Sequence, residues 1–96
     1  MTYAFTQDVP ISMGIYERIR AALGNETPAG LVVHVVIAIE EGLRYVDVWE
    51  SEEACARFTE ERLHPVIGRV FKEIGFRPPA EEPPRQRIDV REVWRP

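Results

Sequence analysis

The chain is poor in the residues that form covalent links and metal centres. It has one cysteine, Cys55, which excludes an intrachain disulfide and a multi-cysteine metal site and fits a reducing cytoplasm, where we expect the protein to lie. Its two histidines have no suitably placed carboxylate or thiol cluster beside them, so no metal is expected. The six glycines stand singly, and neither a glycine-rich phosphate loop nor a Ser-His-acid arrangement is present.

Long apolar runs and clusters of positive charge are also missing. No segment approaches the roughly 20 apolar residues of a membrane span, and the N-terminus lacks the pattern of a signal peptide. Twelve Lys and Arg are outnumbered by sixteen Asp and Glu, which gives a net charge of −4. Because the arginines are scattered among acids, we expect the protein to bind neither nucleic acid nor a membrane.

What remains is the composition of one small globular domain. Hydrophobic residues make up 45% of the chain and charged residues 29%. A chain of 96 residues buries only roughly 60–65% of its unfolded surface, so its core is small and a second chain would add to it. We interpret residues 1–96 as a single domain.

The clearest pattern is residues 31–51, where two runs rich in strand formers flank Glu40-Glu41-Gly42 and lead to a helix cap at Ser51. It predicts a β-hairpin followed by a helix. If Gly42 is a left-handed bulge residue after a type I turn, His34 lies opposite Val48. One face would then hold Val32, His34, Val36, Ala38, Arg44, Val46 and Val48, and the other Val33, Val35, Ile37, Ile39, Leu43, Tyr45, Asp47 and Trp49. Since both faces are largely apolar, we expect helices to cover the first and something else to cover the second.

The other elements follow from periodicity, caps and prolines. The predicted elements are a strand over 3–7, a helix from the cap Ser12 to Gly24, a second helix from Ser51 to Gly75, a polyproline-like connector over 77–87 and a last strand over 88–94. Apolar spacing in the second helix jumps by five between Phe58 and Leu63. We therefore expect that helix to kink or restart at His64-Pro65, where a backbone donor is lost.

The predicted order of strand, helix, strand, strand, helix, strand defines an α+β fold of the ferredoxin-like βαββαβ type, with a four-stranded antiparallel sheet and two helices on one face. In the stretches GLVVHV, EEGLRYVDVWES, EEACARF and ERLHP the chain resembles the dimeric α/β-barrel superfamily, in particular small proteins similar to antibiotic-biosynthesis monooxygenases. The resemblance covers nearly the whole domain. It implies a homodimer in which the sheet face away from the helices packs on a second subunit. The expected interface residues are Val33, Val35, Ile37, Tyr45, Asp47 and Trp49.

That superfamily includes cofactor-independent oxygenases acting on aromatic polyketides, haem-degrading oxygenases, lactone isomerases, polyketide cyclases and many proteins without an assigned function, and fold alone does not choose among them. Three hypotheses stay open. The first is a cofactor-independent enzyme similar to these monooxygenases, acting on a planar apolar or aromatic substrate; the second is a non-catalytic protein that binds a small apolar molecule; the third is a structural dimeric module. No metal, haem or flavin is expected.

The candidate catalytic residues are His34, flanked by valines, and Tyr16, beside the apolar stripe of the first helix. A partly buried imidazole can act as a base, and a phenol can donate a hydrogen bond to a developing oxyanion. The alternatives are a core histidine with satisfied hydrogen bonds and an aromatic residue that packs helix on sheet. The remaining expected ligand-binding residues are Val36, Val46, Val48, Phe58 and His64.

Overall fold

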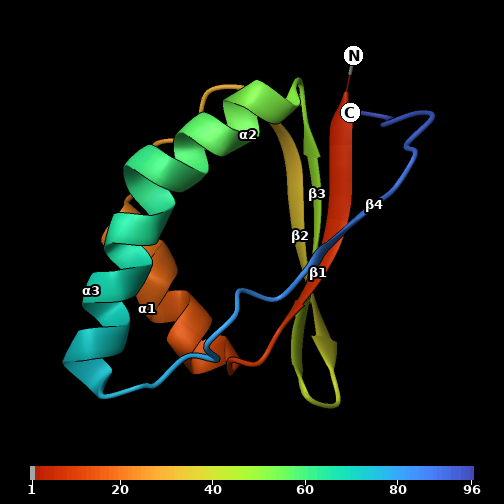
Figure 1. The fold of residues 1–96 in the computed structure, drawn as a ribbon. Coiled ribbons are helices and arrows are strands. Elements are labelled where there is room, and N and C mark those ends of the chain that lie inside the picture. Colours follow the sequence, from red (N-terminus) through yellow and green to blue (C-terminus); the bar gives the residue numbers. More distant parts are fainter. Residues whose placement is uncertain (1) are drawn as a thin grey trace.

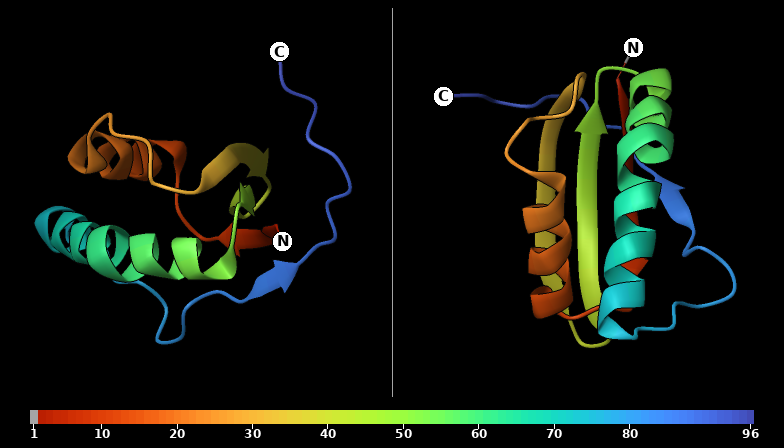
Figure 2. Two further views of the ribbon diagram at one scale, coloured as in Figure 1. Left: turned by 90° about the horizontal axis from the view of Figure 1, so that it is seen from above. Right: turned by 90° about the vertical axis from the view of Figure 1, so that its left-hand side faces the viewer.

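A computed structural model describes residues 2–96 and has the predicted ferredoxin-like architecture (Figure 1). Its sheet is antiparallel with the strand order β2-β3-β1-β4. Both helical units lie on one side of this sheet, as two views of the ribbon agree (Figure 2). The elements are β1 (Tyr3–Val9), α1 (Met13–Leu23), β2 (Leu31–Ile39), β3 (Gly42–Trp49), α2 (Glu52–Phe58), η1 (Thr59–Leu63), α3 (His64–Ile74) and β4 (Arg85–Arg87).

The register of the hairpin differs from the predicted one by a single residue. Glu40 and Glu41 form a two-residue loop, so that Ile39 pairs with Gly42 and His34 lies opposite Asp47. Gly42 has φ +151°, and a Cβ there would lie 2.2 Å from the carbonyl oxygen of Val9. Close backbone approach at this corner therefore requires glycine and fixes where the second strand begins.

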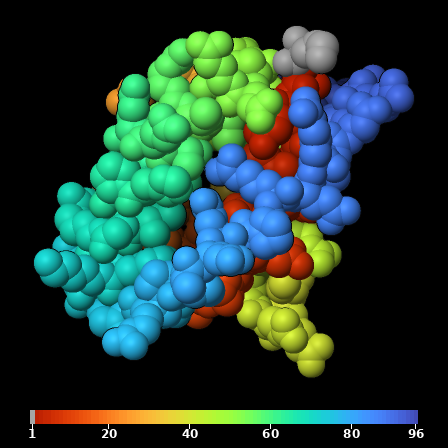
Figure 3. Space-filling model, in the orientation of Figure 1, coloured from red at the N-terminus to blue at the C-terminus, as the bar shows by residue number. Residues whose placement is uncertain are grey.

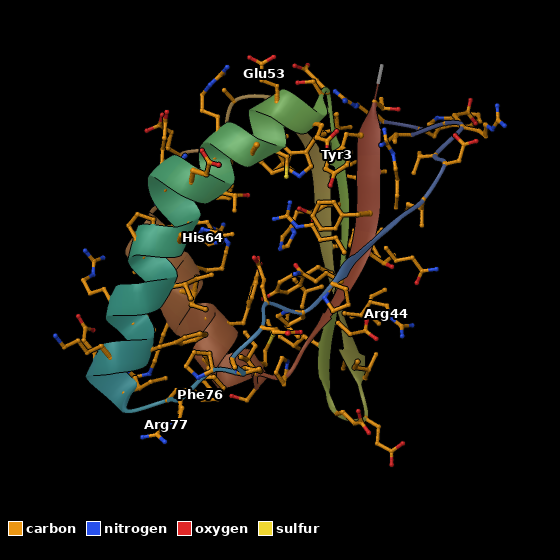
Figure 4. The ribbon with its side chains drawn as sticks, viewed as in Figure 1. Tyr3, Arg44, Glu53, His64, Phe76 and Arg77 are labelled. Carbon is orange, nitrogen blue, oxygen red and sulfur yellow. The ribbon has the colours of Figure 1, made fainter. Side chains whose placement is uncertain are left out.

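A shift of one residue moves every side chain of one strand to the other face of the sheet. His34 and Val36 therefore share the helix-facing side with three residues that the sequence had placed at a dimer interface, Tyr45, Asp47 and Trp49. That assignment was wrong for these three. The prediction that Val46 and Val48 line the ligand cavity was also wrong, because in the observed register their side chains lie on the outer face of the sheet. Figure 4 shows Arg44, of the same parity, on the side away from the helices.

Leu43, which the sequence had also placed on the outer face, is instead buried in the core on the helix side. Three aliphatic residues of β2 do lie on the outer face as predicted. Val33, Val35 and Ile37 alternate with the helix-facing residues of β2, and Val35 and Ile37 are each 42% exposed. The C-terminal segment after β4 passes on this side of the sheet (Figure 2). The outer face thus keeps partly exposed aliphatic side chains along β2.

The core consists of two buried clusters at opposite ends of the sheet. The first contains Tyr3, Phe5, Trp49 and Cys55, and the second contains Ile11, Ile19, Leu43 and Val70. β1 and β3 explain this separation, because Tyr3 pairs with Trp49 at one end and Val9 pairs with Leu43 at the other. The middle of the helix-facing surface lies between the two clusters.

The second helix changes its winding before the proline. α2 is followed directly by a π-helical segment, η1, which joins α3 just before Pro65, and α2 and α3 are visibly inclined to each other (Figure 1). A π turn absorbs one extra residue, which accounts for the five-residue spacing between Phe58 and Leu63. The predicted irregularity exists, but it precedes His64-Pro65 instead of centring there.

The last strand is earlier and shorter than predicted. β4 comprises Arg85–Arg87, which pair with Phe5–Gln7 of β1, whereas 88–94 contains no strand. Ile88 still donates its backbone N–H to the carbonyl of Ala4. Residues beyond Ile88 have almost no partner on β1, because β1 begins at Tyr3. The alternation of Ile88 and Val90 therefore has almost no neighbouring backbone with which to form a ladder.

Candidate functional site

A cavity of about 700 Å³ lies between the helices and the middle of the sheet. It exceeds the roughly 300 Å³ at which ligand pockets begin. Its lining is mostly apolar. Every helix and every strand contributes residues to it, and those of the sheet lie on the helix-facing side. Figure 3 shows a hollow between the helical layer and the segment that leads into β4.

One wall of the cavity carries a chain of hydrogen bonds through His34. Its Nδ1 lies 2.5 Å from Asp47 Oδ1, and its Nε2 lies 2.8 Å from the hydroxyl of Tyr16. The other carboxylate oxygen, Asp47 Oδ2, accepts a hydrogen bond from Trp49 Nε1 at 3.1 Å. Because a carboxylate accepts hydrogen bonds, the proton of a neutral imidazole lies on Nδ1, and Nε2 accepts the hydroxyl proton of Tyr16.

The local structure explains this alignment. His34 and Asp47 are direct cross-strand partners in β2 and β3. Trp49, two residues further along β3, shares the face of Asp47 and is only 2% exposed, so it anchors the carboxylate. Tyr16 stands near the start of α1, whose N-terminus is capped as predicted by the Ser12 hydroxyl.

The two phenols beside His34 are held in their neutral form. Burial raises the pKa of Tyr16, an effect that Arg20 partly offsets and the Asp47 charge reinforces. Burial also raises the pKa of Tyr45, with smaller contributions from Tyr16 and Asp47. The Tyr45 ring centre lies 5.2 Å from that of His34 and 5.7 Å from that of Tyr16. The three rings form an aromatic cluster in which Tyr16 is a neutral donor to the imidazole.

A second polar group lies at the β4 edge of the cavity. The Arg85 guanidinium donates to Cys55 Sγ at 3.5 Å and to Thr59 Oγ1 at 3.3 Å, and it stacks 4.5 Å from the centre of the Phe5 ring. Burial raises the pKa of the Cys55 thiol, partly offset by Arg85, so this cysteine is a neutral core group. The side-chain amide of Gln7 donates to the carbonyl of Pro83 at 2.7 Å.

The structure brings together the two predicted catalytic candidates, His34 and Tyr16. Three predicted ligand-binding residues, Val36, Phe58 and His64, line the cavity. Figure 4 shows His64 on the helical layer. Whether any of them contacts a ligand stays a prediction.

The sequence reasoning missed several polar and aromatic residues of the cavity, among them Gln7, Tyr45, Asp47, Trp49 and Arg85. Three of the omissions share one cause, the wrong hairpin register, which placed Tyr45, Asp47 and Trp49 on the face away from His34. A two-residue loop at Glu40-Glu41 was the signal that would have paired them. Nothing local to Arg85 distinguishes it in the sequence from the other arginines near the C-terminus.

Two negative findings apply to residues 2–96. They include no group of three or more His, Cys, Asp or Glu side chains arranged to hold a metal ion. None of the helices in that range is both long and apolar enough to cross a membrane.

No protein-family model and no curated protein sequence matches the chain. Its structure is similar to the crystal structure of SnoaB, a cofactor-independent oxygenase from Streptomyces nogalater, with 13% sequence identity and a TM-score of 0.51. The match covers 96% of this chain and 93% of SnoaB. At this identity the comparison establishes that the two proteins share the ferredoxin-like α+β fold that the sequence predicted.

Proposed function

We propose that the protein is a cofactor-independent enzyme, similar to monooxygenases, that removes a proton from a planar, largely apolar or aromatic substrate in the cavity. The observation that supports this most is the Asp47–His34–Tyr16 chain at the wall of a mostly apolar cavity. Ordering a carboxylate, an imidazole and a phenol in a poorly solvated place is costly, and apolar packing would not require it. Such groups concentrate at sites of proton transfer.

The hydrogen-bond geometry supports one route for the proton. Because Nε2 of His34 already accepts from Tyr16, a substrate proton would pass to Tyr16 Oη while the hydroxyl proton of Tyr16 passes to Nε2. The Asp47 carboxylate would stabilise the imidazolium that results. The electron pair of the broken bond stays on the substrate, whose anion is then oxidised by dioxygen, as in the oxygenases that the sequence resembles. One oxygen atom stays on the substrate carbon, and the other leaves as water with the relayed proton and a second hydrogen from the substrate. Proton transfer of this kind contributes about 10²–10⁴-fold to a rate.

Screening planar aromatic compounds with an acidic C–H or O–H, such as anthrones and naphthols, with an oxygen electrode tests the proposal. For any substrate found, Tyr16→Phe should lower kcat by about 10²-fold or more, since it removes the relay oxygen. Tyr3→Phe is the matched control, because Tyr3 is a buried phenol that does not line the cavity. Full turnover by Tyr16→Phe and by His34→Gln would contradict the proposed chemistry.

A non-catalytic binding protein for an apolar molecule is the second candidate. It is favoured by the predominance of aliphatic and aromatic side chains in the cavity wall. The two functions separate cleanly in one experiment. A compound that binds with equal affinity to the wild type and to Tyr16→Phe, and that neither protein converts, supports the binding function.

The proposed function includes a homodimer formed through the outer sheet face. Val35 and Ile37 are each 42% exposed there, and the helices of the same chain cover the opposite face. A contiguous aliphatic surface on a chain with a small core is stabilised by burial against a second copy. The resemblance to dimeric α/β barrels supports the same arrangement.

Sedimentation equilibrium at micromolar concentration should give about twice the chain mass of 11.1 kDa. Val35→Glu should shift the protein toward monomer, because it places a charge in the proposed interface. Ala56→Glu, on the exposed surface of α2, is the control for an added charge and should leave the mass unchanged. A wild-type protein that stays folded and monomeric would exclude this dimer.

A further inference from the structure

We propose that Arg85 forms an anion-binding subsite at the β4 end of the cavity, and that the molecule bound there is a planar aromatic compound carrying a carboxylate. This inference rests on the proposed function, because it describes the far end of the same substrate. It adds a recognition element that neither the fold nor the resemblance supplies.

The first supporting observation is that the charge of Arg85 is not neutralised within the chain. Among residues 2–96, no carboxylate forms an ion pair with its guanidinium. The nearest groups are weak or neutral acceptors, the Cys55 thiol and the Thr59 hydroxyl, at long distances of 3.5 and 3.3 Å. A guanidinium has five N–H donors, so several remain free for an incoming group.

The second observation is that Arg85 is fixed in place and lines the cavity. It is half-buried, its guanidinium lies 4.5 Å from the centre of the Phe5 ring, and both of its hydrogen-bond acceptors are buried residues of the helical unit. Stacking on an aromatic ring orients the planar group and leaves its edge open. A preorganised guanidinium edge binds a carboxylate through two parallel hydrogen bonds.

None of the four acidic residues that line the cavity, Glu26, Asp47, Glu81 and Glu82, forms an ion pair with this arginine. Asp47 is engaged by His34 and Trp49. Glu82 pairs with His64 at 3.6 Å, and both of these side chains are about half exposed. The cavity therefore has a negative group committed to the proton relay and a separate positive group without a partner.

The register of the sheet places the proton relay at His34 and the guanidinium of Arg85 at opposite ends of one cavity. Arg85 pairs with Gln7, Gln7 pairs with Tyr45, and Tyr45 pairs with Val36, so one cross-strand row runs over all four strands. His34 lies on β2 and Arg85 on β4, which are three strand spacings apart, or roughly 14 Å between backbones. Because both side chains reach inward, a molecule of two or three fused rings would span from one to the other.

A binding experiment separates this subsite from the catalytic proposal. The probes are 2-naphthoate and its neutral counterpart 2-naphthamide, titrated by isothermal calorimetry against the wild type, Arg85→Gln and Arg87→Gln. Arg87 is the matched control, since it lies on the same strand and also stacks on an aromatic ring, Tyr3, but does not line the cavity. Both variants remove one positive charge.

The wild type should bind naphthoate about tenfold more tightly than naphthamide, which is the usual scale of a charge-assisted hydrogen-bonded pair in a partly solvated site. Arg85→Gln should abolish that preference and leave naphthamide affinity unchanged, whereas Arg87→Gln should keep the preference. If the glutamine variant does not fold, the Nε–H resonance of Arg85 in the wild type should shift with naphthoate and not with naphthamide. Equal affinity of the wild type for both probes overturns the subsite and leaves the cavity proposal standing. Binding of neither probe overturns both.

Discussion

The side chain of Asp47 accepts two hydrogen bonds, and replacing it with asparagine tests the proposed relay most directly. The indole N–H of Trp49 can only donate, and Trp49 is 2% exposed and therefore fixed in place. It would donate its hydrogen bond to the single side-chain oxygen of the asparagine. The asparagine NH₂ group would then point at His34 Nδ1 and donate to it. Asp47→Asn should therefore move the proton of the neutral imidazole from Nδ1 to Nε2.

This change of tautomer removes the acceptor on which the relay depends. With a proton on Nε2, His34 faces the Tyr16 hydroxyl at 2.8 Å as a donor and cannot take its proton. The rate of proton transfer should fall by about 10²–10⁴-fold. Exchanging a charge-assisted hydrogen bond for a neutral one should lower the free energy of unfolding by about 1–2 kcal/mol, since the Asp47 and His34 side chains are only 11% and 26% exposed.

Long-range ¹H–¹⁵N spectra of the imidazole rings measure the tautomer without any substrate. They should be recorded at alkaline pH, so that neutral rings are observed. The wild type should show a protonated Nδ1 on His34, and Asp47→Asn should show a protonated Nε2. His64, the second histidine, is an internal reference in each spectrum. Asp8→Asn, which breaks only an exposed pair with Arg44, is the control. An unchanged His34 tautomer in Asp47→Asn would refute the reasoning.

Two further predictions concern stability. Gly42→Ala should lower the free energy of unfolding by about 1–3 kcal/mol, the usual cost of strained backbone. The reason is that Gly42 has φ +151° and that a Cβ there would lie 2.2 Å from the Val9 carbonyl oxygen. Gly14→Ala, whose Cβ would meet only the Ser12 hydroxyl at 3.7 Å, should stabilise helix α1 by up to about 1 kcal/mol. Urea unfolding of both variants measures this, and equal stability of the two would show that the corner is not strained. The raised pKa of Tyr45 means that the unfolded chain releases this proton first, so its contribution to stability is complete below about pH 10 and is lost as the pH rises further. Tyr45→Phe should therefore lose less stability than the wild type between about pH 10 and pH 12, and identical pH profiles would contradict this origin.

The order of elements was predictable from the sequence because it depends on local signals. Ser12 and Ser51 cap their helices through hydrogen bonds to backbone N–H groups three residues away. The two apolar runs that flank Glu40-Glu41-Gly42 form the hairpin, and the strand order follows the ferredoxin-like pattern. His34 and Tyr16 also stood out locally, as the polar members of otherwise apolar patterns.

The hairpin register was decided by tertiary structure. The Glu40-Glu41-Gly42 turn is compatible with more than one loop, and the alternatives differ by one residue in pairing. In the observed register Gly42 lies close to the Val9 backbone, a contact between segments more than thirty residues apart in the chain that a side chain at this position would block. This register places Asp47 beside His34, so a residue that was expected at the interface is part of the candidate site.

At the end of the chain, too, local sequence predicted an extended segment, but tertiary contacts decided which residues form the strand. Alternating Ile88 and Val90 predicted a strand, but a strand forms only where a neighbouring backbone offers hydrogen-bond partners, and β1 offers them to Arg85–Arg87. The same pairing carries Arg85 into the cavity over the Phe5 ring. The sequence by itself determined which segments are helical or extended, because caps and periodicity act over a few residues; the tertiary structure alone decided which side chains meet, because pairing register depends on contacts between distant segments.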